Sequence, residues 1–149
     1  MAGKYWEEFK TGDRFVTAGK TITETAITLA VGLAGLTEPM FVDAEFARKS
    51  QFKGLMVPGP LTMLMMLGLW QQLGLLGNTG LGFLGFDKVR FLLPVRPGDT
   101  VVVELEVIDT RETSKANAGL VRWHWDCKNQ RNEVVVQMES ANLVSRMNE

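Results

Sequence analysis

The sequence predicts an α+β fold in which several helices precede a run of antiparallel strands. In the first half of the chain, apolar residues recur at the three- and four-residue spacing of helices. In the second half, apolar and polar residues alternate, as they do in strands with one buried face. A chain of 149 residues with 46% hydrophobic residues can bury its own core, so we expect one domain over residues 1–149. Separate runs of helices and strands are typical of the α+β class.

The first elements can be placed by their capping residues. Residues 14–22 favour an early strand, and residues 24–34 favour a helix for which Thr23 is a suitable N-cap. Asp43 is a suitable cap for a second short helix that we expect to continue to Ser50. The apolar residues that share one face of the first helix are Ala26, Leu29, Ala30, Leu33 and Ala34.

The segment from Gly54 to Phe86 contains no charged residue. Pro60 suits the first turn of a helix that runs to about Leu73, where Gly74 can end it. Prolines and glycines divide this segment into apolar runs that are too short to cross a bilayer, so we expect no membrane insertion. A helix without a polar face is instead predicted to be buried on nearly all sides.

The second half predicts four strands, over residues 83–93, 100–110, 118–128 and 133–145. One face of the strand over 100–110 is formed by Val101, Val103, Leu105 and Val107. His124 is the only histidine, and it lies on the polar face of the strand over 118–128. We therefore expect its ring to meet solvent, and we do not assign it to catalysis.

Residues 34–62 carry a motif that resembles the MaoC-like (R)-specific enoyl-CoA hydratase/dehydratase family. The usual run of that family is G-D-x-N-P-x-H-x-D-x-E-F-A, followed by an H-G-x-L-T-like turn into a helix. The matching residues here are Gly35, Pro39, Asp43, Glu45, Phe46, Ala47, Gly59, Leu61 and Thr62. The resemblance covers about residues 8–145.

The resemblance implies a hot-dog fold, in which a curved antiparallel sheet wraps around a long central helix. It also implies a ligand class, the acyl thioesters of coenzyme A or acyl carrier protein, with no other cofactor. The family's catalytic Asp falls on Leu36 and its catalytic His on Phe41, while Glu38 replaces the Asn between them. Both members of the proton-transfer pair are thus replaced by apolar residues.

Hydration of an enoyl thioester needs an acid, a base and hydrogen-bond donors for the enolate oxygen. The resemblance implies that the backbone N–H of Gly59, at the start of the central helix, can serve as this donor. Glu38 is the remaining candidate for proton transfer, because it lies two residues from the substituted Asp position. A solvated loop glutamate is the alternative interpretation of Glu38.

Three functions remain open at this stage. The chain could be a hydratase or dehydratase with altered catalytic groups, a non-catalytic subunit that completes the acyl tunnel of a catalytic partner, or a binder of acyl thioesters or other apolar ligands. The family implies a homodimer or a hetero-oligomer with a catalytic hot-dog subunit. Hot-dog thioesterases usually carry a carboxylate on or near the central helix. Residues 60–73 contain none, which disfavours that class.

Composition excludes several other classes. A net charge of -1 gives no basic excess for nucleic acid. One cysteine and one histidine offer no metal-ligand spacing, and Cys127 has no partner for an internal disulfide. The N-terminal residues contain no apolar signal core, so we expect a cytoplasmic protein.

Overall fold

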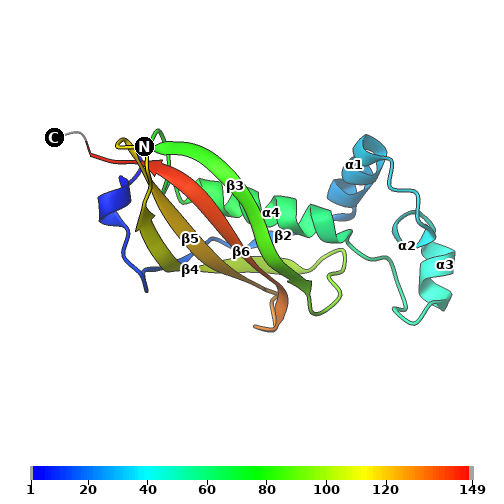
Figure 1. The fold of residues 1–149 in the computed structure, drawn as a ribbon. Coiled ribbons are helices and arrows are strands. Elements are labelled where there is room, and N and C mark those ends of the chain that lie inside the picture. Colours follow the sequence, from blue (N-terminus) through cyan, green and yellow to red (C-terminus); the bar gives the residue numbers. More distant parts are fainter. Residues whose placement is uncertain (1, 148–149) are drawn as a thin grey trace.

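A computed structural model describes residues 2–147 of the chain, which form one antiparallel sheet, a long helix that lies on it and several shorter helices (Figure 1). The strands are β1 (Arg14–Val16), β2 (Lys20–Thr21), β3 (Gly80–Phe91), β4 (Thr100–Glu112), β5 (Ala118–Lys128) and β6 (Val134–Ser145). The helices are the 3-10 helix η1 (Trp6–Glu8), α1 (Glu24–Ala34), α2 (Pro39–Val42), α3 (Ala44–Lys49) and α4 (Gly59–Gln72).

The strand order is β1-β4-β5-β6-β3, with β2 paired to another part of β4. The three long strands β4, β5 and β6 form the centre, where Trp125 lies opposite Leu105 on one side and Met138 on the other. Burial alternates along β4 and β5, as predicted, and His124 lies on the half-exposed outer face. The predicted strand over 14–22 is confirmed at both ends but is divided into β1 and β2.

The long helix α4 lies along the inner face of the curved sheet, which confirms the hot-dog fold (Figure 1). Its buried residues are Leu61, Thr62, Met66, Leu69 and Trp70. All of them except Thr62 join the sheet in one hydrophobic core. The prediction that this helix is buried on nearly all sides was wrong, because Leu64 is 62% exposed and Gln71 and Gln72 are exposed. The sheet covers one side of α4 and leaves the other open in the single chain.

The helices α1, α2 and α3 lie together beyond one end of the sheet, next to the start of α4 (Figure 1). The N-cap predictions are confirmed: the Thr23 side chain accepts a hydrogen bond from the Ala26 N–H, and the Asp43 side chain accepts one from the Phe46 N–H. Only Ile27 of α1 is buried, and Leu33 on its apolar face is 92% exposed. The single chain thus leaves Leu29 and Leu33 of the predicted apolar face uncovered, whereas Ala30 packs against the core.

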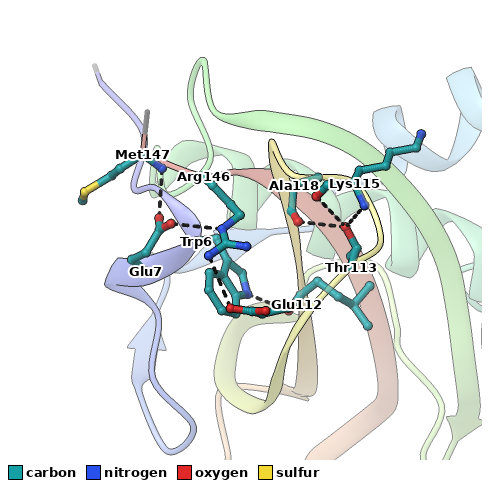
Figure 2. Close-up of polar contacts among 9 residues, drawn as sticks. Trp6, Glu7, Glu112, Thr113, Lys115, Ala118, Arg146 and Met147 are labelled. Atoms are coloured by element: carbon teal, nitrogen blue, oxygen red, sulfur yellow. Dashed lines mark hydrogen bonds and ion pairs between the residues drawn. The ribbon is translucent and has the colours of Figure 1, made fainter. Parts of the chain in front are cut away.

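The N-terminal segment packs against the opposite end of the sheet (Figure 2). The Trp6 indole N–H donates to the Leu120 carbonyl over 3.1 Å, and the Arg146 guanidinium lies 5.0 Å from the centre of the Trp6 ring. Arg146 also forms ion pairs with Glu7 and Glu112. Within residues 2–147, no helix is long and apolar enough to cross a membrane.

Candidate active site

A pocket of about 500 Å³ opens at the first turn of α4. It lies between the loop that precedes this helix and the segment that follows β3. The lining residues are almost all apolar: Phe41, Phe52, Met56, Val57, Gly59, Pro60, Thr62, Phe91, Leu92, Leu93, Pro94 and Val95. None of them carries an ionisable side chain.

Gly59 is the first residue of α4, and its backbone forms part of the pocket wall. Its N–H is one of the donors that a helix leaves without an intrahelical acceptor, and it has no acceptor elsewhere in residues 2–147. A Cβ at this position would come within 2.7 Å of the Phe91 ring, so a larger residue here would require that ring to move. The helix dipole makes this N-terminus favourable for an oxygen that carries negative charge.

Thr62, which the sequence analysis matched to the motif without assigning it a role, also lines the pocket. Its side chain is 1% exposed, and its hydroxyl has no hydrogen-bond partner within residues 2–147. A buried hydroxyl without a partner is unusual, because it has lost its hydrogen bonds to water and forms none within the protein. This unpaired hydroxyl was not predictable from the sequence, because a threonine on an apolar helix face ordinarily bonds to its own backbone.

Phe41 lies where the sequence placed it, in the wall of the pocket. Its ring also contributes to a neighbouring pocket of about 410 Å³ between α1 and α2. Leu36 is half-buried just after α1, and its N–H donates to the Val31 carbonyl over 3.2 Å. Leu36 does not line the pocket beside Gly59.

Glu38 is exposed and is the N-cap of α2, although its side chain makes no capping hydrogen bond. Its carboxylate does not line the pocket beside Gly59. The short helix α2, which sequence reasoning did not predict, begins at Pro39 and turns Phe41 toward the pocket and Glu38 toward the surface. Proline at a first helical position could have signalled this helix.

The other reactive groups do not line this pocket. His124 Nε2 lies 3.1 Å from Asp126 Oδ1 on the outer face of the sheet. Cys127 is fully buried, and burial raises the pKa of its thiol to about 12. In the described part of the chain, no three His, Cys, Asp or Glu side chains are grouped as metal ligands.

The sequence model of the MaoC-like domain matches residues 8–128, which include the pocket and three of the four long strands. The chain belongs to the MaoC-like hydratase/dehydratase family.

Three relatives of this MaoC-like chain illustrate the match. It is 27% identical over 142 residues to the uncharacterized protein YdeM of Bacillus subtilis, covering 94% of this chain and 98% of YdeM. The structure of the monoamine oxidase regulatory protein of Archaeoglobus fulgidus is 29% identical, with a TM-score of 0.92 and coverage of 99% and 98%. The R-hydratase of Pseudomonas aeruginosa is 25% identical, with a TM-score of 0.75 and coverage of 97% and 86%.

Proposed function

We propose that this MaoC-like protein binds acyl thioesters in the pocket at the start of α4, and that its own chain supplies no Asp–His pair there. One observation carries the proposal: the pocket combines an unpartnered backbone donor at a helix N-terminus with walls that contain no ionisable side chain. Such a site can hold a carbonyl oxygen and an apolar chain. It has no group that could move a proton between water and carbon.

The thioester carbonyl is the group that these donors suit. Gly59 and Thr62 both line the pocket, and neither the Gly59 N–H nor the Thr62 hydroxyl has a hydrogen-bond partner within residues 2–147. A carbonyl oxygen bound here would satisfy a donor that otherwise stays unpaired, and the N-terminus of α4 would favour negative charge on it. The acyl chain would lie against the apolar wall near Phe41.

Two cations near the pocket are our candidates for contacts with the phosphates of coenzyme A or of an acyl carrier protein. Lys53 directly follows the pocket residue Phe52, and Arg96 directly follows Val95. Neither side chain forms an ion pair within residues 2–147, unlike Arg48 and Lys88, which pair with carboxylates. Contacts between exposed cations and phosphates weaken as salt is added.

Titrations of the protein with butyryl-CoA and with octanoyl-CoA, in which calorimetry measures the affinity, test this proposal. We expect both to bind, octanoyl-CoA more tightly, and we expect the Lys53→Gln/Arg96→Gln double variant to bind more weakly and with less dependence on salt. Lys10→Gln is the matched control, because Lys10 is exposed far from the pocket in the N-terminal segment. Absence of binding to either thioester would reject the proposal.

A second candidate is a hydratase or dehydratase that uses Glu38 as its acid and base. Two observations favour it: family membership, and the fact that the Glu38 carboxylate has no partner within residues 2–147. The carboxylate would have to turn from the surface toward the pocket when substrate binds. Turnover of trans-2-enoyl-CoA that is lost in Glu38→Gln would establish this candidate.

We also propose that two copies of the chain associate through β3. This strand forms one edge of the sheet, and unpaired edges invite pairing with another strand. Its exposed apolar residues are Leu81, Phe83, Leu84 and Phe91. A second copy could also cover Leu64 on the open side of α4, and a catalytic hot-dog subunit is the hetero-oligomeric alternative.

A further inference from the structure

Phe41 lies between two pockets of the described chain. One is the pocket of about 500 Å³ beside Gly59, here called the α4 pocket. The other is the pocket of about 410 Å³ between α1 and α2, here called the α1–α2 pocket. Among residues 2–147, Phe41 is the one residue that the linings of these two pockets share. The residue at the family's catalytic His position therefore forms a wall of both pockets.

The backbone near Phe41 also bounds both pockets. Val42 and Leu55 line the α1–α2 pocket, whereas Met56, the neighbour of Leu55, lines the α4 pocket. The Met56 N–H donates to the Met40 carbonyl over 3.3 Å, so a hydrogen bond joins segments 40–42 and 55–56. The two pockets thus lie on either side of one pair of connected segments, and Phe41 belongs to both sides.

The lining of the α1–α2 pocket suits the end of an apolar chain. Its apolar residues other than Phe41 are Ile27, Val31, Val42 and Leu55. Ile27 is 3% exposed and forms part of the hydrophobic core, so this side of the pocket is a fixed surface. The far end of an acyl chain carries no polar group, and apolar walls are all that it needs.

We propose that Phe41 limits the length of the acyl chain that the α4 pocket accepts, because its side chain ends that pocket where the α1–α2 pocket begins. This inference rests on the proposed function. Each methylene that moves from water to an apolar wall raises affinity roughly fourfold. A chain that has reached Phe41 places its further methylenes in water again and gains nothing from them. Phe41 is thus a specificity-determining residue with no part in proton transfer.

Calorimetry tests this inference with butyryl-CoA, octanoyl-CoA and dodecanoyl-CoA. In the parent chain, dodecanoyl-CoA should bind no more tightly than octanoyl-CoA. In Phe41→Ala the two pockets become one, and dodecanoyl-CoA should bind more tightly than octanoyl-CoA by at least about tenfold, because the additional methylenes then leave water. The ratio of the two affinities is taken within each chain, so a general loss of affinity in the variant does not affect it.

Phe41→Ala should fold, because Phe41 is half-buried and does not belong to the hydrophobic core. Phe41→Leu is a second variant with a smaller reduction in size. It should shift the preference toward dodecanoyl-CoA in the same direction and by less. If the alanine variant does not fold, the leucine variant decides the question by the same ratio of affinities.

Gly32 offers a control for the path of the chain. It lies in α1 and lines the α1–α2 pocket, and a Cβ at this position meets nothing within 4 Å. Phe41→Ala/Gly32→Phe should fill the α1–α2 pocket and remove the gain for dodecanoyl-CoA. Phe41→Ala/Gly32→Ala leaves most of that space open and should keep the gain.

Several outcomes would overturn the inference while butyryl-CoA still binds and the proposed function stands. One is the same ratio of dodecanoyl-CoA to octanoyl-CoA affinity in the parent and in Phe41→Ala. Another is a parent chain that already prefers dodecanoyl-CoA. A third is a gain that Gly32→Phe does not remove. Absence of binding for all three thioesters would instead reject the proposed function, and this inference with it.

Discussion

At the scale of single residues, Thr62 decides whether the first pocket is built to bind a polar group. Its buried hydroxyl has no partner, so it does not stabilise the fold of the unliganded chain. We predict that Thr62→Val leaves the midpoint of thermal unfolding unchanged or raises it, while weakening octanoyl-CoA binding roughly two- to tenfold. Calorimetry of unfolding and of binding gives both quantities. Lower stability with unchanged affinity would mean that Thr62 has only a structural role.

Cys127 gives a prediction about pH. Burial raises the pKa of its thiol from 9.0 to about 12, because the folded core disfavours the thiolate. A group whose pKa is raised by folding stabilises the protein fully below its unfolded pKa, and that contribution is lost as pH rises toward the folded value. We therefore predict that stability toward urea decreases between about pH 9 and 12, and that the native thiol resists alkylation at pH 8.

The control for Cys127 is Cys127→Ala, which removes the titrating group. This variant should be less stable than the parent chain. Its stability toward urea should, however, decrease less than that of the parent between about pH 9 and 12. Rapid alkylation of the native parent chain at pH 8 would contradict the burial of the thiol between β4 and β6.

At the scale of elements, the N-terminal segment is held by the contact between Trp6 and β5. The Trp6 ring lies directly over Gly119, where an added Cβ would overlap the ring (Figure 2 shows the surrounding contacts). We predict that Gly119→Ala lowers the free energy of unfolding by about 1–3 kcal/mol, the usual cost of an overpacked site. Chemical denaturation measures it.

Gly82→Ala is the matched control for Gly119→Ala, because Gly82 also lies in a strand but a Cβ there meets nothing within 4 Å. Its stability should stay close to that of the parent chain. Similar losses of stability in both variants would mean that the backbone conformation of strand glycines causes the effect. The contact with Trp6 would then not be responsible.

The helices and strands also show which features of the fold can be predicted from the sequence. The caps Thr23 and Asp43 were predictable because each bonds to a backbone N–H three residues away. The strand over 118–128 was predicted with its observed limits, since alternation depends on one buried face. The open side of α4 was not predictable, because an uncharged helix face can be covered either by its own sheet or by another chain.

The candidate site was predictable to a lesser degree. The motif identified Gly59 and Phe41, and both line the pocket. It did not indicate Phe91, which approaches Gly59 from the far end of β3, or the unpaired hydroxyl of Thr62. Contacts between residues about 30 positions apart, and the loss of a local hydrogen bond, depend on three-dimensional packing that spacing does not encode.

At the scale of the whole molecule, the exposed edge strand β3 predicts a dimer. We expect sedimentation at micromolar concentrations to give twice the chain mass of 16.6 kDa. Leu84→Lys should shift the protein toward monomers, because it places a charge on the exposed apolar edge. Val16→Lys is the control, since Val16 is exposed on β1 at the opposite edge. A monomeric parent chain would contradict pairing through β3.

The central claim is that the pocket beside Gly59 binds acyl thioesters without an acid/base pair from this chain. The most direct measurement is a titration of the purified protein with trans-2-butenoyl-CoA, in which binding is measured by calorimetry and the enoyl-thioester absorbance is followed in the same samples. Our account predicts saturable binding with no loss of absorbance. Loss of absorbance that disappears in Glu38→Gln would contradict it and make this chain a hydratase, and absence of binding would reject the ligand class.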